Sequence, residues 1–334
     1  FISCCIAAGA ADRQVKMSLY RSYAEAMREK YGEKVYKLPV NIPVSCPNRD
    51  GAIGTGGCSF CGEAGAGFEN LPDTLPVMDQ LVKNMEYIGK RYGAAKFTAY
   101  FQNFSNTYLP LEDLRRYIEE ASSAEGIVEI CISTRPDCIS DRYLSVIRDV
   151  SEASGCDVCI ELGLQSSDPH TLRQINRGHG LAEFIDAVLR IHSFGFEVCA
   201  HVILDLPWDD DINAVETARI LTALRVEQVK LHSLYIEKGT ELARRYEAGE
   251  FTIISPEEYA DRAVMFLENI SPDMAVQRLV SRAPEENTVF CNWGMSWWRI
   301  RDMITERLES RGSAQGSRCD YLDRDYYSFR KGGR

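Results

Sequence analysis

The sequence has no long hydrophobic run, few histidines and no excess of basic residues. None of its apolar stretches approaches the roughly 20 residues that a membrane-spanning helix needs, so we expect no membrane segment. Its 38 Lys and Arg are outnumbered by 49 Asp and Glu, and the formal net charge of −11 argues against non-specific binding to nucleic acids. With 334 residues, 45% of them apolar, the chain can form one large domain or two ordinary ones.

The twelve cysteines do not follow the pattern of a secreted disulfide scaffold, which is short and has cysteines along its whole length. Three of them lie within sixteen residues and the others are scattered, which favours a reducing, cytoplasmic setting. The first residues lack the basic start of a signal peptide. We therefore expect Met17 to be the natural start and leave residues 1–16 out of the fold.

Short apolar runs alternate with stretches of helical period from residue 34 onward, which is typical of repeated βα units and a parallel sheet. Six units fit between residues 34 and 237, too few for a full eight-stranded barrel. The sequence thus predicts an α/β fold built on a partial (βα)6 barrel at 34–237. Its expected strands are 34–42, 96–103, 127–133, 157–165, 196–206 and 228–236.

The rest of the chain is expected to flank this barrel. Residues 1–33 form an N-terminal segment and helix, and residues 238–311 form a small C-terminal extension. The extension is expected to hold helices near 256–269 and 295–311 and a strand near 273–281. Residues 312–334 form a polar, basic tail that we expect to become ordered only on a partner.

The loop of residues 43–62 directly follows the first expected strand and contains three cysteines: Cys46, Cys58 and Cys61. Its glycines allow the backbone to fold around a compact group. Soft thiolates at such spacing bind zinc or an iron–sulfur cluster. A structural zinc site needs four protein ligands, but no cysteine follows before Cys131 and no histidine before His170. Three thiolates with one open position favour a [4Fe-4S] cluster over zinc or a metal-free loop.

The loop resembles the signature of the radical S-adenosylmethionine (SAM) enzymes, in which two residues separate the last two cysteines. The second of these is often aromatic, as Phe60 is here, and we count Phe60 among the cofactor-binding residues. The first gap is usually three residues but is eleven here, as in the YhcC-like group, which is similar to the radical domain of the elongator-complex tRNA acetyltransferase. The resemblance spans about 18–311 and is carried by Cys-Pro-Asn-Arg-Asp-Gly (46–51), Ser-Thr-Arg-Pro-Asp (133–137), Glu-Leu-Gly-Leu-Gln-Ser (161–166), Asn-Arg-Gly-His (176–179) and Lys-Leu-His-Ser-Leu (230–234).

The resemblance implies a mechanism. The open iron of the cluster would chelate SAM, and one electron from the reduced cluster would cleave the sulfonium to methionine and a 5′-deoxyadenosyl radical, which abstracts hydrogen from a substrate. An electron donor such as flavodoxin or ferredoxin is implied as a partner. The elongator likeness and the basic tail make tRNA the leading substrate class. The alternative is a non-catalytic or electron-transfer iron–sulfur protein, because Asp205 and Trp208 replace glycines of the relatives and would crowd the adenine site.

The resemblance also assigns residues that hold SAM at the ends of successive strands. Gln102 stands where relatives have a Gly-rich turn that contacts the methionine amine. Gln165 matches a residue that binds the ribose or the methionine part, and Arg177 matches one that pairs with the SAM carboxylate. His201 and Ile203 share one face of the fifth strand and match contacts to ribose and adenine. The structural alternatives are a turn-capping amide for Gln102, an exposed ion pair for Arg177 and a core histidine for His201.

Weaker signals remain. Residues 133–137 and His232, near the ends of the third and sixth strands, would face the substrate or order loops. The acidic run 209–211 is expected to cap the next helix. Cys156 and Cys159 enter a strand, so we expect packed thiols there rather than a second cluster. Near the C-terminus, we favour the apolar stripe of a docking helix over a stacking platform for an RNA base: Trp297, Ile300, Ile304 and Leu308.

Overall fold

The computed structural model describes residues 18–62 and 70–319. Its central feature is a curled, parallel, seven-stranded sheet with the order β1-β2-β3-β4-β5-β6-β8. The partial barrel is therefore confirmed. The strands are β1 (Val35–Val40), β2 (Lys96–Phe101), β3 (Ile127–Thr134), β4 (Asp157–Gln165), β5 (Glu197–Ile203), β6 (Gln228–His232) and β8 (Ala275–Arg278).

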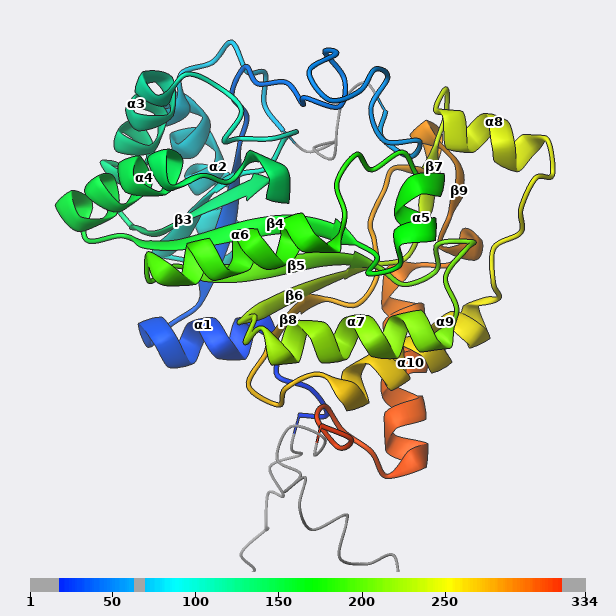
Figure 1. Ribbon diagram of the computed structural model, residues 1–334. Coiled ribbons are helices and arrows are strands. Elements are labelled where there is room, and N and C mark those ends of the chain that lie inside the picture. The colour runs from blue at the N-terminus through cyan, green and yellow to red at the C-terminus, as the bar shows by residue number, and fades with distance from the viewer. Residues whose placement is uncertain (1–17, 63–69, 320–334) are drawn as a thin grey trace, which may run out of the picture.

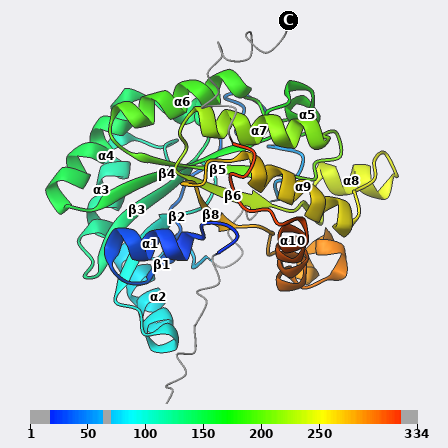
Figure 2. The ribbon, with the colours of Figure 1, turned by 90° about the horizontal axis from the view of Figure 1, so that it is seen from below.

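Helices cover the outer face of the sheet, where Figure 2 shows them in an arc. They are α2 (Val77–Tyr92), α3 (Leu111–Ser122), α4 (Asp141–Ser154), α6 (Leu181–Ser193) and α7 (Asp211–Ala223). A short helix, α5 (Pro169–Gln174), precedes α6 and ends before the turn that contains Gly178. The expected cap of α7 is also present, since the Asp210 side chain accepts a hydrogen bond from the backbone N–H of Asn213.

The sheet has one strand more than the six we expected in the barrel. β8, from the predicted extension, pairs in parallel with β6 and forms the second edge of the sheet. The N-terminal helix α1 (Tyr23–Tyr31) contacts both edge strands, β1 and β8, and lies between them in Figure 2. Residue Pro39 lies in β1, where the missing N–H is tolerated because the strand is at an edge. The C-terminal part thus helps to close the half-barrel.

Apart from a 3-10 turn after β3, the remaining elements lie beyond β6 in the chain, and Figure 1 shows several of them beside the ends of the strands. The packing of α10 against α9 buries Ile300, Ile304 and Leu308 of the predicted stripe, and the partly buried Trp297 packs against the same core, which confirms a docking helix. No helix of the described residues is long and apolar enough to cross a membrane. The elements are β7 (Tyr235–Glu237), α8 (Glu241–Glu247), α9 (Pro256–Asn269), β9 (Thr288–Cys291), α10 (Trp297–Arg311) and the short 3-10 turns Pro136–Cys138, Glu285–Asn287 and Asn292–Gly294.

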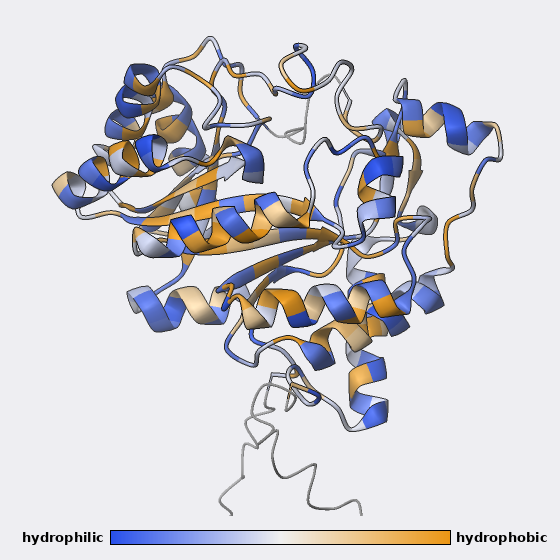
Figure 3. Ribbon diagram, in the orientation of Figure 1, coloured by the Kyte–Doolittle hydropathy of each residue, from blue (hydrophilic) through white to orange (hydrophobic). Residues whose placement is uncertain are grey.

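The two faces of the sheet differ in chemistry, as β4 shows. Val158, Ile160, Leu162 and Leu164 belong to the main apolar core shared with the helices. The alternate residues of β4 have the opposite orientation and face the barrel interior, because successive side chains of a strand point to opposite sides. Figure 3 shows how apolar the strands are as a whole. Polar residues at a few inward positions therefore stand out, and they build the site.

Residues 1–16 and Met17, and most of the predicted basic tail, lie outside the described residues. The second C-x₂-C pair is packed as expected. Cys159 lies in a buried cluster inside the barrel with Tyr100, Cys131 and Cys199. Cys156 belongs to the main core, so these thiols fill space.

Candidate functional site

A cavity of about 530 Å³ lies inside the half-barrel, at the carboxyl ends of the strands. This is where barrels of parallel strands place their working sites. The cavity brings together all three loop cysteines and most of the predicted cofactor-binding residues. Those that line it are Cys46, Cys58, Phe60, Cys61, Gln102, Gln165, Arg177 and His201, and the weaker candidates Ser133, Thr134, Arg135 and His232 line it too.

Ile203 is the one predicted SAM contact that is not among the lining residues. It is buried in a smaller apolar cluster, against which Phe60 packs. His201, two residues earlier on the same face of β5, does line the cavity. The two residues thus share a face as predicted, but only His201 is presented to this space.

The cysteine loop is held at the cavity by its own backbone and by a neighbouring turn. The N–H of Gly57 donates to the carbonyl of Asn48 at 2.8 Å, and the N–H of Ser59 donates to the carbonyl of Ile175 at 2.9 Å. Gly57 has φ 82°, a conformation that other residues rarely adopt. Asn48 is buried, and its amide donates to the carbonyl of Asn176 at 2.7 Å. These bonds fix the loop around its cysteines.

Each cysteine sulfur lies next to an arginine side chain. The arginines come from three separate segments: the cysteine loop, the turn after β3 and the turn after α5. Positive charge favours the thiolate form, which is the form that binds metal. The pairs are Arg49 Nη2 with Cys61 Sγ (3.6 Å), Arg177 Nη1 with Cys58 Sγ (3.4 Å) and Arg135 Nη1 with Cys46 Sγ (4.0 Å).

The donor set fits an iron–sulfur cluster. Burial raises the pKa of Cys61, and the nearby Cys58 raises it further, so Cys61 by itself favours the thiol form. A bound metal reverses this preference, because it replaces the protons and makes thiolates the stable form. Three convergent sulfurs and three guanidinium groups are therefore suited to an anionic metal–thiolate centre. Sequence reasoning had missed the part of Arg49, although it lies within the quoted Cys-Pro-Asn-Arg-Asp-Gly motif.

Gly163, Gln165 and Arg177 form a compact unit beside this centre. Arg177 Nη2 donates to the carbonyl of Gly163 at 2.6 Å, while its buried Nε has no hydrogen-bond partner in the described structure. Gln165 ends β4 with φ 73°, in the strained left-handed region, at a register shift between β4 and β5. A Cβ on Gly163 would lie 2.6 Å from Arg177 Nη2 and 2.9 Å from Gln165 Nε2. The absence of a side chain at 163 thus allows this arrangement.

Asp205 and Trp208, where relatives were expected to carry glycine, do not crowd the cavity. Asp205 is buried and accepts a hydrogen bond from the Leu234 N–H at 2.6 Å, and burial raises its pKa to about 7. The Trp208 ring packs against Phe251, with Arg245 over its face. Neither side chain is among the residues that line the cavity. Trp208 packs instead against the apolar cluster that contains Ile203, so crowding of an adenine site on that cluster stays a prediction.

Glu161 is the centre of the cavity floor. One side chain from each of β1, β2, β3, β5 and β6 donates a hydrogen bond to its carboxylate. Burial alone would raise the pKa of Glu161, but Lys230 and Lys37 outweigh it and hold the pKa well below its usual range. The donors are Lys37 Nζ, Tyr100 Oη (2.6 Å), Ser133 Oγ (3.2 Å), His201 Nε2 (2.7 Å) and Lys230 Nζ (3.3 Å).

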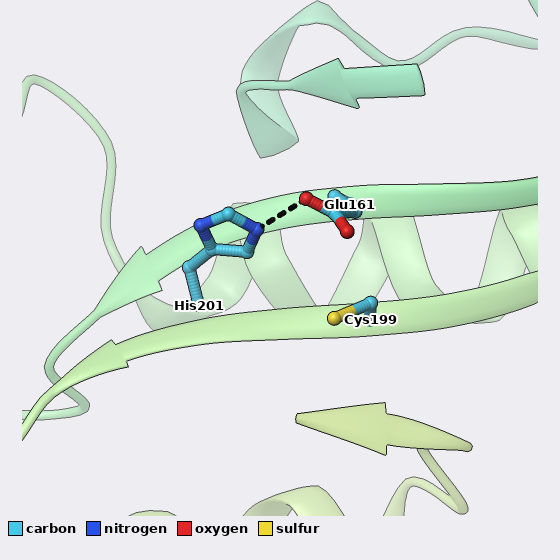
Figure 4. Close-up of side chains that lie close together, drawn as sticks. All are labelled: Glu161, Cys199 and His201. Atoms are coloured by element: carbon cyan, nitrogen blue, oxygen red, sulfur yellow. Dashed lines mark hydrogen bonds and ion pairs between the residues drawn. The ribbon is translucent and has the colours of Figure 1, made fainter. Parts of the chain in front are cut away.

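Glu161, Cys199 and His201 lie close enough together to suggest a second metal site (Figure 4), with their ligand atoms within 4.8 Å of one another. Two observations argue against one. The ammonium groups of Lys37 and Lys230 already contact the Glu161 carboxylate, so a metal cation would meet like charges. Burial also raises the pKa of Cys199 well above its usual value, which keeps it a thiol. The group is a hydrogen-bonded floor.

We expect Glu161→Gln to lower the free energy of unfolding at neutral pH by about 3 kcal/mol or more, because two buried ammonium groups lose their counter-charge. The lowered pKa of Glu161 means that the carboxylate stabilises the fold above about pH 4.5, its unperturbed value, and that this contribution is lost as the pH falls further. The difference between wild type and variant should therefore shrink in acid. Urea unfolding at several pH values measures it.

The matched control is Glu241→Gln, which removes the carboxylate of an exposed ion pair with Arg244 and should leave unfolding nearly unchanged. Equal stability of Glu161→Gln and wild type at pH 7 would contradict the central role of this carboxylate.

Comparison with known proteins agrees with this geometry. The model of the radical SAM superfamily matches residues 42–221, more than half of the chain, and the model of the radical SAM C-terminal domain matches residues 226–310. The uncharacterized protein YtqA of Bacillus subtilis is 34% identical over 308 residues, which cover 92% of this chain and 94% of the relative. The protein YhcC of Escherichia coli is 31% identical over 299 residues, covering 90% and 95%.

Elongator complex protein 3 is a more distant relative. The human protein is 26% identical over 188 residues, which cover 55% of this chain but 33% of the human protein. In structure, the Elp3 of the archaeon Methanocaldococcus infernus has the same fold, with a TM-score of 0.63 at 17% identity over 84% of this chain and 64% of the archaeal one. From the three-cysteine half-barrel and these matches together, the chain belongs to the radical SAM superfamily.

Proposed function

We propose that the protein is a radical SAM enzyme that holds a [4Fe-4S] cluster on Cys46, Cys58 and Cys61. The observation that carries the proposal is the convergence of three cysteine sulfurs, each beside an arginine, at the edge of the barrel cavity. When bound, the cluster and SAM supply a one-electron cleavage of the sulfonium and a carbon radical that takes hydrogen from a substrate. A donor such as flavodoxin or ferredoxin, in the cytoplasm, would supply the electron.

The chain's own residues would bind and orient SAM. The Nε edge of Arg177, which has no hydrogen-bond partner in the described structure, would bind the SAM carboxylate. Gln165, beside Arg177 in a strained backbone conformation, would bind the ribose or the methionine part. Gln102, which lines the cavity just after β2, would contact the methionine amine. His201 would contact the ribose, because its ring lines the cavity above Glu161. Phe60 and Ile203, which share one apolar cluster, would provide the surface for the adenine.

The cleavage of SAM tests the proposal directly. After anaerobic reconstitution, addition of dithionite and SAM should yield 5′-deoxyadenosine in the wild type, detected by mass spectrometry. Cys58→Ala should yield none, because the cluster loses one of its three ligands. Cys291→Ala is the matched control, since Cys291 lies on β9 and not at the cavity, and it should behave like the wild type.

Deoxyadenosine formation that persists in Cys58→Ala would refute the assignment of the ligands. If the iron-loaded wild type binds SAM, as judged by its spectrum, but cleaves none, cleavage depends on the substrate. A cluster whose spectrum ignores SAM would instead support the alternative, an electron-transfer iron–sulfur protein.

We expect Gly163→Ala to weaken SAM binding by about tenfold or more, a loss of about 1.4 kcal/mol. The added methyl group would displace the Arg177 guanidinium and the Gln165 amide. Iron content should stay at the wild-type level, since the cysteines are untouched. A titration of the cluster spectrum with SAM gives the affinity. Gly89→Ala, in helix α2 with no contact closer than 3.6 Å, is the control. Unchanged SAM affinity in Gly163→Ala would contradict the assigned subsite.

The leading substrate class is tRNA, on the strength of the likeness to elongator complex protein 3 over the radical domain. The chain's net charge of −11 means that contact with RNA would have to be local. We expect a mobility shift with bulk tRNA at about 50 mM salt that weakens strongly by about 200 mM, as phosphate contacts require. No shift at the lower salt concentration would remove tRNA as the leading class.

A further inference from the structure

The cavity carries more positive charge than its carboxylates balance. Among the described residues that line it, Glu161 is the only acidic one, and it is already shared by Lys37 and Lys230. Arg278, the last residue of β8, lines the cavity as well. Within the described part of the chain, no carboxylate lies within ion-pair distance of Arg278, since its hydrogen bonds run to His232 alone. Arg278 is half-buried, and a cation partly withdrawn from water without a counter-charge is costly unless a ligand supplies one.

The surroundings of Arg278 leave much of its guanidinium available. Its Nη2 donates to Nδ1 of His232 at 2.6 Å. Burial lowers the pKa of His232 well below its usual value, and Arg278 itself adds to the effect, so the imidazole is a neutral acceptor and brings no negative charge. The Nε of Arg278 is buried and has no hydrogen-bond partner in the described structure. A guanidinium has five N–H donors in a planar fork, which suits a two-oxygen acceptor.

We propose that Arg278, together with Lys230, binds a terminal carboxylate or phosphate group of the substrate. Lys230 lines the same cavity on β6, the strand next to β8. Burial lowers its pKa, and the positive charge of Arg278 adds to that effect. The inference rests on the proposed function, because it takes this cavity as the place where the substrate meets SAM. It adds the chemical class of the group that the substrate brings into the barrel.

The carboxylate of SAM is a poor candidate for this position. Arg49, Arg135 and Arg177 contact the cysteine sulfurs, whereas Arg278 contacts His232 on β6. In the proposed function Arg177 would hold the SAM carboxylate, beside the cysteine sulfurs and not beside His232. An internal phosphodiester of RNA is also a poor candidate, because its chain continues in two directions and about 530 Å³ must also hold SAM, so confirmation of this anion site would count against tRNA as the substrate class. A terminal anion fits.

The test is a calorimetric titration of the reconstituted, unreduced protein with SAM bound. Acetate and inorganic phosphate are titrated separately. The wild type should bind at least one of the two. Arg278→Gln should weaken that binding by about tenfold or more, because a charge-assisted bidentate contact is lost. The anion affinity of Arg278→Lys should lie between those of the wild type and Arg278→Gln. Arg299→Gln, which removes an exposed arginine of α10, is the matched control and should bind like the wild type.

Stronger binding of acetate would identify a carboxylate substrate, and stronger binding of phosphate would identify a phosphate monoester. If the wild type binds neither acetate nor phosphate, the proposal is overturned. Anion binding that survives in Arg278→Gln but is lost in Arg177→Gln would also overturn it, since the anion would then occupy the SAM carboxylate position. If Arg278→Gln does not fold, as judged by circular dichroism, Arg278→Lys decides, and wild-type affinity in that variant would overturn the bidentate contact.

The spectral response to SAM separates this proposal from the proposed function. Arg278→Gln should keep that response, because Arg278 contacts none of the cysteines. If the wild type itself shows no response to SAM, the proposed function fails. The same titration without SAM then still tests anion binding by Arg278.

Discussion

The half-barrel depends on one buried carboxylate. Glu161 receives hydrogen bonds from side chains on β1, β2, β3, β5 and β6, and Lys37 extends the network to Gln277 on β8 at 3.0 Å. In a full barrel, layers of branched apolar side chains fill the interior and hold the strands together. Here a polar network takes that place, so the strands are held from inside while space remains above the floor. The low pKa of Glu161 follows from the same contacts.

Positively charged side chains lie at two positions in the cavity, one at the cysteine loop and one on the floor around Glu161. At the loop, three arginines contact three sulfurs; Arg135 also pairs with Asp137, and the proposed metal–thiolate centre would supply negative charge to the other two. On the floor, two lysines contact one carboxylate and Arg278 has none in the described structure, so positive charge remains. The two histidines do not change this, because burial lowers the pKa of His201 to about 4 and that of His232 well below its usual value. The cavity therefore has a second place for an anion.

Much of the fold and part of the site could be predicted from sequence, because they depend on local patterns. The apolar runs gave six strands within a few residues, and the spacing of Cys46, Cys58 and Cys61 indicated their common site. The pairing of β8 could not be derived, because a four-residue strand leaves too short a pattern. The Glu161 network could not be predicted either, since its members lie far apart in the chain, with 193 residues between Lys37 and Lys230 and 240 between Lys37 and Gln277. A signal was present: Lys37, Glu161 and Lys230 are charged residues within otherwise apolar strands, where charges are rare unless paired.

The positions of Arg177 and Arg278 limit how a substrate can lie in the cavity. Arg177 is fixed beside Cys58 and the Gly163 carbonyl, while Arg278 is fixed beside His232. If each guanidinium holds one carboxylate or phosphate, the anionic groups of SAM and substrate are kept apart, and their mutual repulsion is reduced. Two anchored ends also fix the reacting parts of both molecules in the space between, which is the geometric requirement for hydrogen transfer between them. A neutral substrate would gain no such anchor from Arg278, and the positive charge of Arg278 would remain without a counter-charge.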